Sequence, residues 1–264
     1  MGPSLGNAAQ MLIAGARPGL LLAIGAILGA IVGSFLGTVA MRLPAGRSIV
    51  AAPSACDGCG RRLAPRDLVP ILSWLALRGR CRHCGASIGT GQLVAEAGGA
   101  LIGALAWLGP PDTVLPGLPA MVLGWQLLLL ALLDARALWL PWRLNALLAA
   151  SGLGLAALAG ADALAWAILG GGLGYGLLAL VAAFYRRWRG RAGLGGGDPL
   201  LLGAIGTWVG PLGVPPVLLG AAGLGLAVAG LMRLCGRPIH GATMLPFGTF
   251  LAVAAWPVFV FGLA

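Results

Sequence analysis

The chain has 264 residues, of which 59% are hydrophobic and 9% charged, whereas about 25% are charged in a typical soluble domain. This composition excludes a soluble globular protein and indicates a membrane protein with several spans, because each helical crossing needs about 20 apolar residues. The net charge of +10 comes from arginine alone. These arginines lie between apolar stretches, as the positive-inside rule requires of cytoplasmic loops, so we expect no nucleic-acid partner.

Apolar windows along the chain predict an all-α polytopic membrane protein with about eight transmembrane helices. The windows cover residues 20–40, 93–109, 117–133, 143–160, 163–184, 198–212, 214–232 and 245–263. If the spans alternate across the bilayer, the arginines between them fall on one side and only Arg17 falls on the other. That side is therefore expected to be the cytoplasm, with both termini outside and membrane lipid around the helices.

The first window carries glycine at every fourth position, at Gly25, Gly29, Gly33 and Gly37. Such spacing places the glycines on one helix face, where a second helix can approach closely. We expect three regions: an external N-terminus with the first span at residues 1–41, a cytoplasmic insert at 42–92, and a transmembrane core at 93–264.

The insert contains two C-x-x-C pairs, 21 residues apart, which predict a small zinc-binding subdomain. The four cysteines are Cys56, Cys59, Cys81 and Cys84. Two such pairs complete a closed tetrahedral site of the structural kind. Disulfides or a redox motif are the alternative, which a cytoplasmic location disfavours. His83, inside the second pair, is interpreted as a solvated loop residue and not as a ligand.

Ionisable residues at the ends of membrane spans are candidates for function because burying them is costly. Asp134 ends the third window, and Asp198 opens the sixth, directly after three glycines. Two carboxylates held close together suggest an aspartic protease, in which one acts as base on a shared water and the other as acid. Structural alternatives are an N-cap at Asp198, with Pro199 after it, and an ion pair of Asp134 with Arg136.

Glu96 lies just inside the second window. It is interpreted as a satisfied structural residue, with a role beside the active site or the zinc subdomain as the alternative.

Separated motifs in this chain resemble, in order, those of the type IV prepilin peptidase family, whose members share a G-x-G-D signature with intramembrane aspartic proteases. The similar segments are Gly33-Ser34-Phe35-Leu36 with Arg42-Leu43-Pro44, the paired cysteines around Val69-Pro70-Ile71-Leu72-Ser73-Trp74, Asp134 with Leu140-Pro141, Gly195-Gly196-Gly197-Asp198, and Leu245-Pro246-Phe247-Gly248. The match runs through most of the chain. It departs from the family pattern at Gly37, Trp142 and Leu200, where members commonly have Asn, an acidic residue and Lys.

The resemblance implies a bacterial inner-membrane aspartic endopeptidase with Asp134 and Asp198 as catalytic residues. Its substrates would be type IV prepilins or type II secretion pseudopilins, cleaved at the cytoplasmic face. The resemblance also implies methylation of the new N-terminus with S-adenosylmethionine, for which the residues themselves offer no motif. The alternative from another class is a non-catalytic assembly subunit of a pilus or secretion system, and a proton-coupled transporter would require inverted repeats that we do not find.

Overall fold

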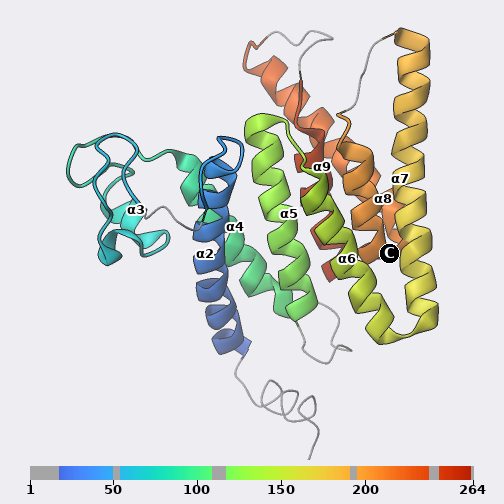
Figure 1. Ribbon diagram of the computed structural model, residues 1–264, viewed down its shortest axis with the longest axis horizontal. Helices are drawn as coiled ribbons and strands as arrows, with labels where there is room; N and C mark the ends of the chain where they lie inside the picture. Colours follow the sequence, from blue (N-terminus) through green and yellow to red (C-terminus); the bar gives the residue numbers. More distant parts are fainter. Residues whose placement is uncertain (1–17, 50–53, 109–116, 191–194, 238–243, 263–264) are drawn as a thin grey trace, which may run out of the picture. The chain divides into compact units, whose positions relative to one another are not determined.

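The computed structural model describes residues 18–49, 54–108, 117–190, 195–237 and 244–262, and in these residues the chain is mainly helical (Figure 1). Six of the described helices are long and apolar enough to cross a membrane, and a shorter apolar helix follows them. The predicted all-α polytopic fold is therefore confirmed. The chain divides into two compact units, Met1–Leu129 and Leu130–Ala264.

In the first unit, helix α2 (Pro18–Arg42) packs against α4 (Thr90–Leu105), which continues as the short 3-10 helix η2 (Ala106–Leu108). Figure 1 shows the two helices side by side. Any Cβ at Gly25 or Gly29 would collide with a backbone carbonyl of α4. Gly25 faces Gly103 and Gly29 faces Gly99, so the helices run antiparallel. The prediction that the glycine face of the first span receives another helix is confirmed.

The insert between these helices consists of turns around η1 (Pro65–Asp67) and α3 (Leu72–Ala76). Each cysteine pair lies in a turn closed by an isolated antiparallel bridge, Ala55 to Arg62 in one and Arg80 to Ser87 in the other. An ion pair of 2.9 Å between Arg82 Nη2 and Asp67 Oδ1 joins the second turn to η1.

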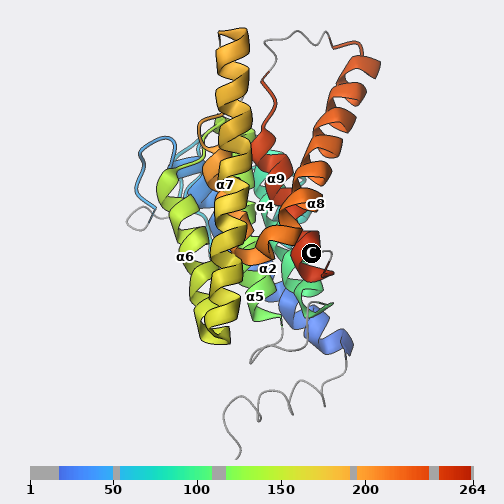
Figure 2. The ribbon, with the colours of Figure 1, turned by 90° about the vertical axis from the view of Figure 1, so that its right-hand side faces the viewer.

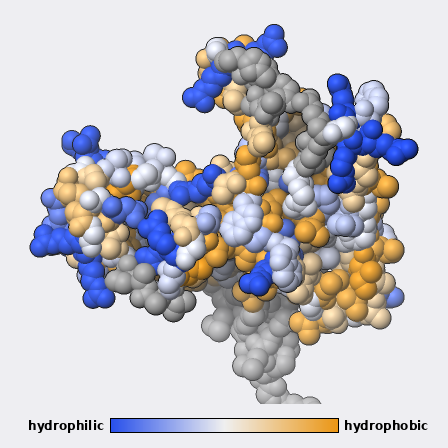
Figure 3. Space-filling view, turned by 45° about the horizontal axis from the view of Figure 1, so that its top comes forward, coloured by the Kyte–Doolittle hydropathy of each residue, from blue (hydrophilic) through white to orange (hydrophobic). Residues whose placement is uncertain are grey.

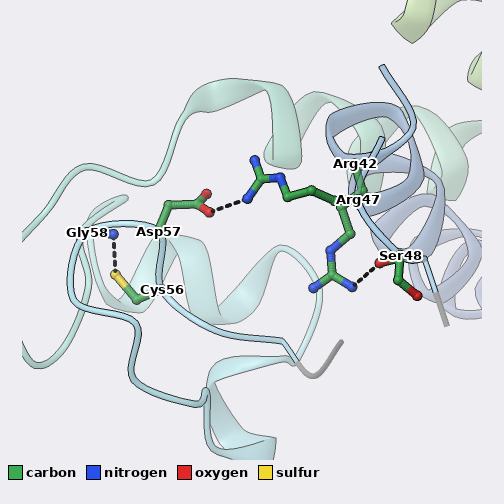
Figure 4. A network of polar contacts seen from close by, with 6 residues as sticks. All are labelled: Arg42, Arg47, Ser48, Cys56, Asp57 and Gly58. Carbon is green, nitrogen blue, oxygen red and sulfur yellow. Dashed lines mark hydrogen bonds and ion pairs between the residues drawn. The ribbon is translucent and has the colours of Figure 1, made fainter. Parts of the chain in front are cut away.

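The first turn of the insert is joined to the segment that follows α2 (Figure 4). Arg47 Nη1 lies 3.6 Å from Asp57 Oδ1, and Arg42 donates a hydrogen bond of 3.3 Å to the Ser48 carbonyl. Both side chains of the ion pair are largely exposed, so this contact contributes little to stability.

The second unit contains the end of α5 (Leu118–Ala137) and helices α6 (Trp142–Ala159), α7 (Ala161–Arg189), α8 (Asp198–Leu234) and α9 (Phe247–Val260). The backbones of helices α7 and α8 lie in close contact. A Cβ at Gly170 would collide with the Gly206 carbonyl, and one at Gly174 would collide with the Leu202 carbonyl. This close antiparallel contact is the small-residue packing that membrane helices use in place of large apolar side chains.

Helix α8 is bent at Gly210, whose φ of 68° and ψ of 179° lie outside the helical region, and Pro211 follows it. The predicted windows 198–212 and 214–232 are the two halves of this one bent element. The second half runs antiparallel to α9, with Gly220 beside Ala254 and Gly225 beside Phe250. Figure 2 shows the two halves of α8 pointing in different directions. The bend returns the chain toward the end of the unit at which α8 began.

On the face shown in Figure 3, the flanks of the helices are largely hydrophobic, and the strongly hydrophilic side chains gather at helix ends and on the insert. One such group lies at the end of α7, where Arg186, Arg187 and Arg189 occupy the last turn. The distribution matches helices that present apolar flanks to lipid.

Candidate active site

Asp134 lies in the last turn of α5 and is held by the start of α9. Its side chain is buried, with 5% of the residue exposed. The backbone N–H of Thr249 donates a hydrogen bond of 2.7 Å to Asp134 Oδ2, and the Thr249 hydroxyl lies 3.1 Å from the same oxygen. The hydrogen-bond partner of Asp134 is therefore Thr249. The alternative interpretation, an ion pair of Asp134 with Arg136, does not describe this residue.

Asp198 is the first residue of α8 and is also buried, with 4% of the residue exposed. Its Oδ2 accepts a hydrogen bond of 3.0 Å from the Gly195 backbone N–H, which lies before the helix. The N-cap position belongs to Gly197. Asp198 therefore does not act as the N-cap of its own helix, which was the structural alternative for this residue.

Leu140 lies between the two aspartates. A Cβ added to Gly197 would lie 2.6 Å from Leu140 Cβ. A Cβ added to Gly248 would lie 2.7 Å from Leu140 Cδ1 and 3.1 Å from Asp134 Oδ2. The structure thus brings both carboxylates, 64 positions apart in the chain, to the same end of the second unit.

The glycine segment before Asp198 is exposed. Gly195 and Gly196 are exposed, and a Cβ at Gly196 would meet no atom within 4 Å. Because glycine has no side chain, these two positions allow another backbone to come close to the carboxylate. The observed geometry is thus two buried carboxylates at one end of the unit, one of them beside an exposed glycine segment.

The four insert cysteines form a separate cluster in the first unit. Their sulfur atoms all lie within 4.8 Å of one another, and Cys56 Sγ is 3.8 Å from Cys84 Sγ. A tetrahedron with Zn–S bonds of about 2.3 Å has edges of about 3.8 Å, so the cluster fits a tetrahedral ion. All four are free thiols. The predicted cluster of four thiols, able to bind one metal ion, is confirmed.

Backbone N–H groups within the cluster favour a thiolate. The N–H groups of Cys84 and His83 point at Cys81 Sγ and lower the pKa of this thiol to about 6. His83 itself is exposed, and its Nδ1 lies 3.1 Å from Nη1 of Arg61. In the described residues, the metal-compatible group consists of the four cysteines without His83.

Glu96 is hydrogen-bonded to helices of the first unit and to the insert. Its Oε1 accepts hydrogen bonds from the Ser34 hydroxyl (2.8 Å) and from Gln92 Nε2 (3.0 Å). Its Oε2 accepts a hydrogen bond of 2.6 Å from the Ile71 backbone N–H. The residue is 5% exposed. It therefore joins α2, α4 and the turn before α3, which is the satisfied structural role expected of it.

Sequence reasoning missed Thr249 as a partner of Asp134. A signal was present, because Thr249 directly follows the Leu245–Gly248 motif. It also missed Gln92, which lies four residues before Glu96 and hence one helical turn from it.

The fold and site define a class: polytopic membrane proteins with paired buried aspartates and a four-cysteine insert. Residues 27–109 match the Bacterial Peptidase A24 N-terminal domain, and residues 121–230 match the Type IV leader peptidase family. Over 271 residues the chain is 35% identical to a prepilin leader peptidase/N-methyltransferase of Burkholderia pseudomallei (strain 1026b), covering 92% of this chain and 86% of that protein. The chain therefore belongs to the prepilin leader peptidase/N-methyltransferase family.

Two further relatives carry the same name. The Aeromonas hydrophila protein is 34% identical over 212 residues, which cover 79% of this chain and 71% of the relative. The Pseudomonas aeruginosa protein is 33% identical over 266 residues, which cover 89% of each chain. No solved structure matches the chain.

Proposed function

We propose that this protein is a prepilin leader peptidase of the bacterial inner membrane. It is an aspartic endopeptidase that removes leader peptides from type IV prepilins or type II secretion pseudopilins. One observation carries the proposal: two buried carboxylates, Asp134 and Asp198, lie at the same end of the second unit on either side of Leu140. The names of the relatives support the same substrate class.

In the mechanism we propose, the two aspartates hold one proton and one water between them. The ionised aspartate takes a proton from the water, whose oxygen attacks the scissile carbonyl carbon, and the protonated aspartate donates to the carbonyl oxygen. Collapse of the tetrahedral intermediate then breaks the C–N bond: the departing nitrogen takes the proton that the first aspartate received from the water, and a hydroxyl of the intermediate returns a proton to the other aspartate. Thr249 holds Asp134 in place throughout.

The active site faces the cytoplasm in this proposal, because the arginines gather at that end of the spans. Arg136 lies in the last turn of α5, two residues after Asp134, and Arg186, Arg187 and Arg189 occupy the last turn of α7. By the positive-inside rule, helix ends rich in arginine lie in the cytoplasm.

The protein also methylates the new N-terminal amine in this proposal, with S-adenosylmethionine as donor. The support for this activity is the N-methyltransferase name shared by the relatives.

The four-cysteine cluster binds one structural zinc ion, held by Cys56, Cys59, Cys81 and Cys84, and residues 42–92 form a zinc subdomain between the first span and the transmembrane core. A closed four-thiolate site stabilises the fold of such an insert and takes no part in hydrolysis.

The test is co-expression with a prepilin, followed by gel mobility and mass spectrometry of the mature N-terminus. The wild-type protein is expected to yield the shortened, methylated pilin. Asp134→Asn and Asp198→Asn are each expected to leave the prepilin at full length. A chain that acts as an assembly subunit without catalysis would tolerate both substitutions, and processing by either variant would contradict the proposed mechanism.

A further inference from the structure

Asn145, in the first turn of α6, is a buried side chain that the mechanism above does not use. It is 3% exposed, and within the described residues neither its amide nitrogen nor its amide oxygen has a hydrogen-bond partner. A buried unpaired amide costs about 1–3 kcal/mol of stability, so its presence in a helix interface requires an explanation.

The face of α6 on which Asn145 lies is packed against α8. The buried residues of α6 are Asn145, Leu148 and Gly152, which follow helical spacing along one stripe. A Cβ at Gly152 would contact the Thr207 hydroxyl, and the Leu148 carbonyl accepts a hydrogen bond of 2.8 Å from Trp208 Nε1. Asn145 therefore faces α8.

The contacts between α6 and α8 also give the depth of Asn145. Leu140, just before α6, lies beside Gly197, and the Ala149 carbonyl lies 3.4 Å from the Thr207 hydroxyl, so the two segments run in the same direction. Asn145 lies between these two contacts and is therefore at a level between Gly197 and Thr207, on the side of α8 that begins with Asp198. Side chains in a helix incline toward its N-terminus, so the Asn145 amide is directed toward the end of the unit that contains Asp198.

The two aspartates are held unequally. Asp134 is fixed by the backbone N–H and the hydroxyl of Thr249. Asp198 has one described donor, the Gly195 N–H, and Gly195 belongs to an exposed glycine segment. Among the described residues, Asp198 thus has fewer donors than Asp134.

We propose that Asn145 is a positioning residue for Asp198, which it reaches through one bridging water molecule. The amide supplies a donor and an acceptor, and the carboxylate supplies the further acceptor that such a water needs. Held in this way, Asp198 keeps the orientation required for proton transfer. The inference rests on the proposed function, since it assigns Asn145 to the same reaction.

The experiment measures kcat, KM and melting temperature of purified Asn145→Leu with a prepilin peptide. Leucine has a similar volume but cannot bind the water, so kcat is expected to fall about tenfold at unchanged KM and without a lower melting temperature. Thr207→Val is the matched control, because it removes a hydroxyl from the same interface deeper in the unit. Its kcat is expected to equal that of the wild type.

The inference would be overturned if Asn145→Leu had the kcat of the wild type. It would also be overturned if Asn145→Leu and Thr207→Val lowered kcat by the same factor. If Asn145→Leu does not fold, Asn145→Ser and Asn145→Ala give the same comparison. The serine hydroxyl can hold the water, so its kcat is expected to exceed that of the alanine variant, and equal values would contradict the inference. Asp198→Asn separates the two proposals: if it is active, the proposed function fails, and if it is inactive while Asn145→Leu is fully active, only the role of Asn145 fails.

Discussion

Replacement of Glu96 by glutamine is expected to loosen the insert from the helices that carry it. Both carboxylate oxygens of Glu96 accept hydrogen bonds: Oε1 from Ser34 and Gln92, and Oε2 from the Ile71 N–H. Glutamine has a single acceptor oxygen. In either orientation of its amide, an N–H group would therefore face one of the donors.

The magnitude follows from the bond that is lost and from the turn it holds. Ile71 has φ 63° and ψ −54°, and the Leu72 N–H bonds to the Pro70 carbonyl at 2.6 Å, which defines a strained γ-turn. A hydrogen bond to a charged group contributes about 1.5–3 kcal/mol. Glutamine either loses the bond that holds Ile71 or keeps it with a neutral acceptor, so the free energy of opening of this turn should fall by at least about 1 kcal/mol, or roughly fivefold in the opening equilibrium.

Hydrogen exchange followed by mass spectrometry checks this expectation in the purified protein. A peptide that spans residues 68–77 should exchange at least about fivefold faster in Glu96→Gln than in the wild type. Ser34→Ala is the control, because it removes one donor to Oε1 and leaves the Ile71 bond intact. Unchanged protection of this peptide in Glu96→Gln would refute the reasoning.

Three further outcomes are expected. Gly29→Ala should lower the melting temperature, because the new Cβ would collide with the backbone of α4. Gly19 lies in open space, so Gly19→Ala should leave the melting temperature unchanged or raise it. Equal effects of the two substitutions would contradict the close packing of the helices. Cys56→Ser should reduce zinc measured by elemental analysis from about one ion per chain to none, and unchanged zinc would exclude the four-thiolate site. Thr249→Val removes the hydroxyl near Asp134 but keeps the N–H bond, so prepilin cleavage should slow about fivefold, roughly 1 kcal/mol; an unchanged rate would show that the hydroxyl does not matter.

Features fixed by local pattern could be predicted from the sequence. Runs of apolar residues gave the helices, and arginines marked their ends. The four-residue repeat through Gly25 and Gly29 predicted a close helix partner, which α4 provides. The spacing of the cysteines predicted their cluster, because each pair lies in its own short turn.

The sequence did not reveal which distant segments meet. Thr249 lies 115 residues from Asp134, and although it directly follows the Leu245–Gly248 motif, the motif does not indicate that Asp134 is its partner. The bend at Gly210 depends on a positive φ, and glycine followed by proline permits such a conformation without requiring it. The orphaned amide of Asn145 becomes visible only when its surroundings are known, since an asparagine near a helix start is ordinary in sequence.

The most direct test of the account is the single-turnover rate of leader cleavage in membrane vesicles that contain the wild type, Asp134→Asn, Asp198→Asn or the double variant. Residues that act as one catalytic unit are strongly non-additive, so each single substitution is expected to lower the rate as far as the double substitution does. A single variant that cleaves at the wild-type rate would contradict the claim that these two buried carboxylates work together.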